Sequence, residues 1–433
     1  MSEQALFRNP KRRPLGPGMS WYEYYAGYSE EFVKDTLRFL SLPTGATVLD
    51  PWNGTGITTQ VAYDAGLAAV GYDINPAMVL VARARLLDCT VADSLQSLCR
   101  DIIRKAARDR SGDYLHPDPL ELWLSPRSAR EVRKIEQAVQ RLLIDHRDRV
   151  GLFAKHGFSD VSSLAALFYV ALFRTLRELL VPFRSSNPTW IKHPRSKPSR
   201  LRPNATKLHS LFLSQVEGMA EIVRQRPSIL GQRAGIPAPI VDLGSSISIP
   251  LRDDSVEAVV ASPPYCTRID YAVSTKPELA LLGCSMGGDI RALRDQMIGS
   301  PTVTKATPQR SSDWGPTCMQ FLSAVETHRS KASSTYYLKT YLQYFCLTYA
   351  SLAEIGRTLT NAGRCVLVVQ DSLYKDVHND LPRIYEEMGA SLGWNLLLRE
   401  DFSVDRTMAK INPQAKRYAD NRQTTESVLV FQN

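Results

Sequence analysis

The stretch Val48-Leu49-Asp50-Pro51-Trp52-Asn53-Gly54-Thr55-Gly56 decides the fold class of this chain. A short apolar strand ends in a carboxylate, enters a glycine turn, and is followed by a helical pattern from about Thr58 to Ala65. Such a turn lets the backbone approach a ligand closely while the N-terminus of the helix faces it. The stretch therefore predicts a strand–turn–helix unit with a ligand site at the turn.

The elements after this turn continue the alternation. Leu67 to Tyr72 is typical of a second strand, which ends at Asp73, and Pro76 opens a helix that runs to about Leu87. Strand, helix, strand, helix at this spacing begins a doubly wound, mostly parallel sheet. Further strands are predicted at 239–242, 256–261, 363–370 and 427–431. We predict a Rossmann-like α/β fold.

The alternation is interrupted in the middle of the chain. Residues 1–90 are expected to form an N-terminal arm and the first half of the sheet domain, and residues 239–433 its second half. A Gly/Ser/Thr-rich stretch at 283–335 is expected to be a mobile loop. Residues 91–238 are dominated by helical patterns, at 93–108, 126–146, 161–181 and 207–226. We interpret this middle part as a helical insertion carried by the sheet domain, and either it or the stretch 283–335 is a candidate for recognising the binding partner.

Composition excludes several classes of protein. The 433 residues include seven cysteines with no CxxC pair, which argues against a disulfide framework or a zinc ribbon and favours a reducing cytoplasm. No HExxH pattern proposes a metal site. The most apolar stretch, Val161 to Leu180, is interrupted by Arg174 and Arg177 and falls short of a membrane span. We expect a cytoplasmic protein without a metal or a membrane partner.

Positive charge gathers in one segment of a chain whose net charge is +9. Val181 to Lys207 contains seven Lys or Arg residues and no acid. Basic side chains neutralise phosphates and aromatic rings stack on bases, although a charge run is also compatible with a merely solvated surface. The candidate nucleic-acid contacts are Arg184, Trp190, Lys192, Arg195, Lys197, Arg200 and Arg202.

The carboxylates around the glycine turn indicate which ligand it holds. Asp50 would repel the diphosphate of a dinucleotide, and Thr59 replaces the third glycine of that fingerprint. A carboxylate suits the sulfonium and amino group of S-adenosylmethionine instead. Asp73, 23 residues further on, is placed to accept hydrogen bonds from ribose hydroxyls. The alternative is an ordinary strand–helix turn.

A second motif, Ser262-Pro263-Pro264-Tyr265, follows the strand predicted at 256–261. Two prolines fix the backbone, so that carbonyl oxygens point to where an exocyclic amine would sit. The Ser262 hydroxyl can accept a second amine hydrogen, and the Tyr265 ring can stack on the base. Such a pocket works through orientation and electrostatics and needs no strong base. The alternative is a proline turn that closes a strand.

Both motifs resemble those of one enzyme family. Asp50 to Gly56 resembles the DPFxGxG cofactor motif, and Ser262 to Tyr265 the (D/N/S)PP(Y/F/W) motif, of the S-adenosylmethionine-dependent DNA amino-methyltransferases. These enzymes modify adenine N6 or cytosine N4 after base flipping. The serine version is similar to the cytosine-N4 branch, as are the stretches 265–271 and 426–431. The resemblance covers about 15–90 and 239–433 and leaves the insertion unexplained.

The resemblance also implies a set of cofactor residues. Gly244-Ser245 stands where the family often has Gly-Asp to bind the adenine of the cofactor, so Asp242 competes with Ser245 for that contact. Aromatic residues before the first strand, Trp21, Tyr22, Tyr24, Tyr25 and Tyr28, either pack over the methionine part of the cofactor or belong to the core. The full set is Asp50, Pro51, Asn53, Gly54, Gly56, Asp73, Ile74, Asp242 and Ser245.

Three residues after the second motif need separate interpretation. Cytosine-C5 methyltransferases attack through a cysteine directly after proline, but here Tyr265 stands between Pro264 and Cys266, which argues against a covalent mechanism. Arg268 and Asp270 either line the pocket, with Arg268 a further nucleic-acid contact, or form a salt bridge beside it.

The resemblance implies a bacterial, nucleoid-associated DNA methyltransferase that acts on cytosine N4. Its expected cofactor is S-adenosyl-L-methionine and its expected partner double-stranded DNA, with a cognate restriction endonuclease or another defence protein as a candidate partner. Three alternatives stay open: methylation of adenine N6 in DNA, methylation of guanine N2 in structured RNA, and a non-catalytic nucleic-acid-binding subunit.

Overall fold

The computed structural model describes most of the chain. The described residues are 6–10, 21–22, 27–110, 115–144, 158–185, 190–226, 235–266, 270–303, 307–404 and 424–433. Three residues singled out in the sequence, Tyr24, Tyr25 and Arg268, lie outside these ranges.

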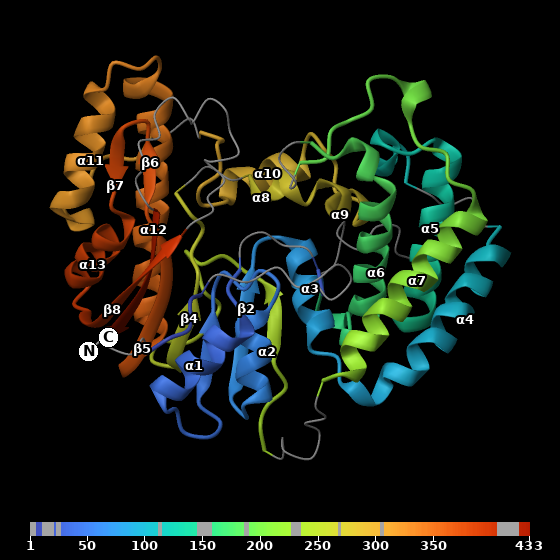
Figure 1. Ribbon diagram of the computed structural model, residues 1–433, viewed down its shortest axis with the longest axis horizontal. Helices are drawn as coiled ribbons and strands as arrows, with labels where there is room; N and C mark the ends of the chain where they lie inside the picture. Colours follow the sequence, from blue (N-terminus) through green and yellow to red (C-terminus); the bar gives the residue numbers. More distant parts are fainter. Residues whose placement is uncertain are drawn as a thin grey trace.

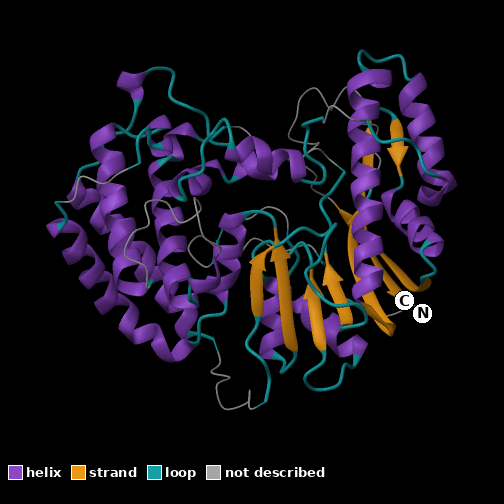
Figure 2. Cartoon of the chain, turned by 180° about the vertical axis from the view of Figure 1, so that it is seen from behind, coloured by secondary structure: helices purple, strands orange, loops and turns teal. Residues whose placement is uncertain are grey.

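A seven-stranded sheet forms the centre of the molecule (Figure 2). Its strand order is β3-β2-β1-β4-β5-β9-β8, and β9 alone among these strands runs antiparallel to both its neighbours. The strands are β1 (Thr47–Asp50), β2 (Ala68–Asp73), β3 (Ile240–Leu243), β4 (Val256–Ala261), β5 (Leu359–Gln370), β8 (Asn395–Val404) and β9 (Thr424–Gln432). A separate hairpin pairs β6 (Ser372–Tyr374) with β7 (Val377–Asn379). The predicted doubly wound, mostly parallel sheet is confirmed.

Helices cover both faces of this sheet. Helices α1 (Glu30–Leu40) and α2 (Ile57–Asp64) pack on one face. On the other face lie α11 (Gly315–Thr327), α12 (Leu338–Thr358) and α13 (Leu381–Ser391). Strand β9 shows the alternation that this requires: Val428 and Val430 contact the first layer, and Leu429 and Phe431 the second. Burial on both faces explains the continuous apolar run of this strand.

The region between β2 and β3 forms a helical bundle beside the sheet (Figure 1). It contains α4 (Leu95–Arg108), α5 (Pro126–Leu143), α6 (Ser163–Leu179) and α7 (Ala205–Arg224). Its core continues into α3 (Pro76–Arg85), which packs against α6 and is buried along almost its whole length. The bundle therefore shares a helix with the sheet domain.

Short helices after β4 connect the bundle to the edge of the sheet. These are α8 (Tyr271–Ser274), α9 (Lys276–Leu281) and α10 (Asp289–Gln296), which lie above the carboxyl ends of the strands in Figure 1. Two arginines of the bundle hold them. Arg133 Nη2 donates to the carbonyl of Ala280 at 2.8 Å, and Arg177 pairs with Glu278, whose carboxylate is fully buried, at 2.5 Å.

The expectation of a mobile loop at 283–335 is wrong for much of that stretch, because α10 and α11 lie within it. Small polar residues suggested a loop, but α11 is held by apolar residues at helical spacing that pack onto the sheet layer, namely Cys318, Phe321, Leu322 and Val325. The sequence interpretation also omitted β8 and α13, which lie between two strands that it did predict.

The described residues carry neither a helix long and apolar enough to cross a membrane nor a group of three His, Cys, Asp or Glu side chains able to hold a metal ion. All seven cysteines are described, and none of them forms a disulfide bond.

Candidate active site

A cavity at the carboxyl edge of the sheet unites the two sequence motifs. It encloses about 990 Å³, including the space at its open mouth. Strands β1 and β4 are direct neighbours in the sheet, so the turn after one meets the motif after the other. From the predicted site the wall includes Asp50, Pro51, Asn53, Gly54, Asp73, Ile74, Ser245, Ser262, Pro263, Pro264 and Tyr265.

The glycine turn depends on backbone that other residues would strain. Gly56 has φ +76° and stands at the N-terminus of α2, and a Cβ there would lie 2.6 Å from the Cβ of Ala82 on α3. Gly56 is thus a packing residue that lets α2 approach α3, behind the wall that Gly54 lines. This placement differs from the direct ligand contact expected for Gly56.

Asp73 at the end of β2 organises the turn. Its Oδ2 accepts the backbone N–H of Gly54 at 2.9 Å, and its Oδ1 accepts that of Asn75 at 2.8 Å. Burial raises the pKa of Asp73 to about 6, against the lowering effect of these two hydrogen bonds. Each carboxylate oxygen keeps a further lone pair, so a ribose hydroxyl could still donate to it.

Asp50 at the end of β1 is only 3% exposed. Its carboxylate accepts the Tyr28 hydroxyl at 3.1 Å and the backbone N–H of Trp52 at 3.1 Å. Burial raises the pKa of Asp50 to about 7, although the hydrogen bonds from Thr58, Trp52 and Tyr28 lower it. A desolvated carboxylate in a cavity wall favours a cationic ligand, which would replace the lost solvation.

Asp242 and Ser245, the two alternatives predicted from the sequence for an adenine contact, differ in their position relative to the cavity. Ser245 lines the cavity, whereas Asp242 pairs with Arg83 (Oδ1 to Nη2, 3.5 Å) on α3 and is no part of the wall. Of the described aromatic residues before β1, Tyr28 lines the cavity. Trp21 lies in the core of the bundle and its indole N–H donates to a carbonyl of α3.

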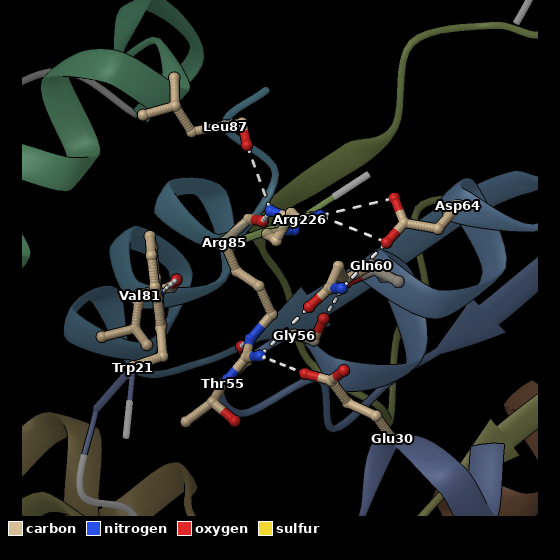
Figure 3. Close-up of polar contacts among 11 residues, drawn as sticks. Trp21, Glu30, Thr55, Gly56, Gln60, Asp64, Val81, Arg85, Leu87 and Arg226 are labelled. Carbon is tan, nitrogen blue, oxygen red and sulfur yellow. Dashed lines mark hydrogen bonds and ion pairs between the residues drawn. The ribbon is translucent and has the colours of Figure 1, made fainter. Parts of the chain in front are cut away.

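Arg85 supports the glycine turn from behind (Figure 3). Its Nε donates to the carbonyl of Thr55 at 2.8 Å, and its Nη1 donates to Glu30 and Gln60, each at 3.1 Å. This buried guanidinium therefore joins the turn to α1, α2 and α3. An arginine in the otherwise apolar sequence of α3 is the signal from which this role could have been inferred.

The Ser-Pro-Pro-Tyr motif is held by three hydrogen bonds from different elements. The Ser262 hydroxyl donates to the carbonyl of Val368 on β5 at 3.2 Å. The carbonyl of Pro264 accepts the hydroxyl of Tyr344 on α12 at 2.9 Å. The Tyr265 hydroxyl donates to Oε1 of Glu426 on β9 at 2.8 Å. Because the Ser262 proton is committed to Val368, the lone pairs of this hydroxyl can face an amine in the cavity.

Of the residues after the motif, Tyr271 lines the cavity, whereas Asp270 and Cys266 lie outside its wall. Tyr271 lines the cavity, and burial raises the pKa of its hydroxyl to about 12. Asp270 instead caps α8 by accepting the N–H of Val273 at 3.0 Å, and pairs with Arg294 at 2.7 Å. This is the salt-bridge alternative for Asp270. Cys266 is buried outside the cavity wall.

The basic segment lies on the bundle and contributes nothing to the cavity wall. The Trp190 ring is 48% exposed, and Arg184 is held by a backbone bridge to Ile191. Arg200 pairs with Glu121 at 3.7 Å. The exposed cations of the predicted set are Arg184, Lys192, Arg195, Lys197 and Arg202.

A search of known proteins finds distant sequence similarity between this chain and a methyltransferase. The fold is a Rossmann-like α/β fold with a mostly parallel seven-stranded sheet, consistent with that class of enzyme. The chain is 22% identical over 313 residues to the type II methyltransferase M.BsoBI of Geobacillus stearothermophilus. The alignment takes in 68% of this chain and 58% of that protein, so the chain spans less than two thirds of the relative's length. No protein-family profile matches the chain.

Proposed function

We propose that this protein is an S-adenosylmethionine-dependent DNA methyltransferase that transfers a methyl group to N4 of a flipped-out cytosine. The observation that carries the proposal is the single cavity in which the Asp50 turn and the Ser262 motif meet at adjacent strand ends. A ligand-binding turn and an amine-binding motif are both needed for amine methylation, and either one alone would leave the reaction incomplete.

The cofactor half of the cavity fits a cation with a ribose. S-adenosylmethionine supplies an electrophilic methyl group on a sulfonium. Asp50 is buried and Asp73 is half-buried, and desolvation raises their pKa values to about 7 and about 6, so a bound cation stabilises their ionised forms. Asp50 would attract the charged methionine part, and Asp73 would accept the ribose hydroxyls.

The other half of the cavity fits an exocyclic amine. In this proposal the Ser262 hydroxyl and the Pro263 carbonyl accept the two amine hydrogens, since the Pro264 carbonyl is already bonded to Tyr344. This orients the nitrogen lone pair toward the methyl donor. The Tyr265 ring stacks on the base. Positioning of this kind contributes several kcal/mol to a reaction that requires no strong base, about 7 to 11 in the best intramolecular cases.

The substrate in the proposal is double-stranded DNA. The exposed cations of the segment from Lys192 to Arg202 would neutralise phosphates and help to offset the few kcal/mol that base flipping costs. The similarity to a type II methyltransferase supports a role in restriction–modification, with a cognate endonuclease as partner in a bacterial cell.

The test is to incubate the purified protein with tritiated S-adenosylmethionine and unmethylated genomic DNA, and to separate the digested nucleosides. Label in N4-methylcytosine is expected. Label in N6-methyladenine would retain the enzyme class and contradict the choice of base. Absence of label from DNA, with or without label in RNA, would contradict the proposal. A Ser262→Ala variant serves as the matched control for contaminating activity.

A further inference from the structure

A buried carboxylate stands behind the Ser-Pro-Pro-Tyr motif. Glu426 is 4% exposed and lies on β9, between Gln370 of β5 and Phe402 of β8 in the register. It is linked to the cavity through Tyr265, because its Oε1 accepts the Tyr265 hydroxyl at 2.8 Å. The cavity wall contains Tyr265 and, within the described chain, does not contain Glu426.

Burial of the Glu426 carboxylate at this position of β9 carries a desolvation penalty. Val428 and Val430 share its face of β9 and pack in the apolar layer under α1 and α2. An ionised side chain at this level loses solvation unless hydrogen bonds replace it. A carboxylate at this position is not needed to complete the layer, which the valines already fill. What the carboxylate adds is a strong, directional acceptor for the phenol.

The bond also decides what the phenol of Tyr265 can do. Burial, and then the charge of Glu426, raise the pKa of Tyr265 well above its usual value, so its hydroxyl stays protonated and keeps donating. That proton is committed to Glu426, the hydroxyl also interacts with Ser262, and Tyr265 itself lines the cavity. Gly299 approaches from another side, where an added Cβ would lie 3.1 Å from the Tyr265 carbonyl. Ring and backbone are thus restrained separately.

We infer that Glu426 is a positioning residue, which fixes the orientation of the Tyr265 ring as the stacking surface for the substrate base. The inference rests on the proposed function for the identity of the substrate. A phenylalanine or tryptophan, which the resembling family motif also admits at the position of Tyr265, could not form this bond. The tyrosine of this chain is therefore matched to Glu426.

A double-mutant cycle tests the coupling. Glu426→Leu removes the acceptor, and Tyr265→Phe removes the donor but keeps the ring. Each change leaves one buried polar group without its partner, so each is expected to lower kcat about tenfold at saturating DNA and cofactor. The double variant is expected to be no slower than the slower single variant, because only one interaction is lost. Glu426→Gln, which keeps an acceptor oxygen, is expected to stay within about threefold of the wild type.

Tyr28 provides the matched control. It is another buried tyrosine whose hydroxyl donates to a carboxylate, that of Asp50, on the cofactor side of the same cavity. Tyr28→Phe is expected to weaken cofactor binding, and its effect is expected to multiply with that of Glu426→Leu. Unchanged kcat in Glu426→Leu, or multiplying effects for the Tyr265 and Glu426 pair, would overturn the inference. If Glu426→Leu does not fold, an unchanged kcat in Tyr265→Phe overturns it equally.

A readout without turnover separates this inference from the proposed function. In cofactor-free protein, NMR is expected to show a slowly exchanging Tyr265 hydroxyl proton, assigned by its loss in Tyr265→Phe. The signal is expected to persist in Glu426→Gln and to vanish in Glu426→Leu. Its absence from the wild type, or its persistence in Glu426→Leu, would overturn the inference. A wild type that transfers no methyl group but shows the expected NMR pattern would contradict the proposed function alone.

Discussion

The two halves of the cavity hold their polar groups in opposite ways. On the cofactor side, the buried Asp50 and the half-buried Asp73 have carboxyl pKa values raised to about 7 and about 6, so the protein stabilises their charge incompletely. On the motif side, the Ser262 proton, the Pro264 carbonyl and the Tyr265 proton are all bonded to other protein groups. The first half therefore favours a positively charged ligand, and the second half has polar groups whose orientation is fixed before a ligand binds.

This difference follows from what each half is proposed to bind. A cationic cofactor can supply the charge that the carboxylates lack, so binding and ionisation are linked. An amine on a flipped base is neutral and must be oriented, and orientation requires groups that are fixed before the base arrives. We therefore expect changes on the cofactor side to alter affinity, and changes on the motif side to alter the rate.

The largest expected effect is the loss of kcat on substitution of Ser262, on the motif side of the cavity. Ser262→Ala removes one acceptor for the amine, and kcat is expected to fall about 100- to 1,000-fold, by analogy with loss of one fixed polar group at a reacting centre. Calorimetric titration is expected to give an unchanged dissociation constant for S-adenosylmethionine. A weakened cofactor with an unchanged kcat would contradict the division between the halves.

The next effect concerns the backbone on the cofactor side. Gly56→Ala and Gly45→Ala both place a side chain at positive φ, +76° and +79°, but only the Cβ at position 56 meets a neighbour, at 2.6 Å from Ala82. Both changes incur the cost of a left-handed backbone, about 1 to 2 kcal/mol. Gly56→Ala is expected to destabilise by a further 1 to 3 kcal/mol, about the cost of overpacking.

Urea unfolding of the two glycine variants measures this difference directly, with Gly45→Ala as the control for backbone strain. Equal free energies of unfolding would mean that α2 does not need its close approach to α3. Gly56→Ala is also expected to weaken cofactor binding, because the shift of α2 displaces the turn that Gly54 presents.

A tenfold effect is expected from pH. Below pH 7 the Asp50 carboxyl is increasingly protonated, and a cationic ligand must then displace that proton. The affinity for S-adenosylmethionine is therefore expected to rise about tenfold per pH unit up to about pH 7 and then to level off, with Asp73 adding a second step near pH 6. Asp50→Asn should bind weakly and lose the step near pH 7. A flat wild-type profile between pH 5.5 and 8.5 would contradict the electrostatic interpretation.

The smallest expected effect lies outside the cavity. Lys192→Ala and Arg195→Ala each remove one exposed cation of the basic segment. Each is expected to weaken binding to any DNA sequence and to reduce the salt slope of log K by about 0.9. Lys105→Ala, an exposed lysine on α4 of the same bundle, is the control and should leave the slope unchanged. An unchanged slope in all three variants would assign the basic segment to a solvated surface.

The sequence predicted those parts of the site whose chemistry is local. Asp50, Gly54 and Ser262 stand in short motifs at strand ends, and the parallel sheet brings strand ends to one edge. Glu426 and Tyr344 lie far from these motifs in sequence and reach them only through the fold. The stretch 426–431 resembles the cytosine-N4 branch, but nothing in it links Glu426 to Tyr265, and a tyrosine in a helix, as at Tyr344, is equally typical of other roles.

The same distinction explains the result for the fold. Helices of the bundle follow a clear apolar period and were predicted within a few residues, as α6 shows (161–181 predicted, Ser163–Leu179 found). Helix α11 was missed because the small polar residues of the stretch 283–335 outweighed its apolar spacing, and strand β8 was missed as well. Leu396 and Leu397 of β8 are exposed, and this strand is held at the sheet edge by its pairing with β9.

The most direct measurement is a crystal structure of the protein with a non-reactive S-adenosylmethionine analogue and its DNA substrate. We predict the amino group of the analogue beside Asp50, and the exocyclic amine of a flipped cytosine within about 3 Å of both the Ser262 hydroxyl and the Pro263 carbonyl. A cofactor analogue bound outside this cavity, or a target base still stacked in the duplex with the cavity holding neither group, would contradict the assignment of the two halves.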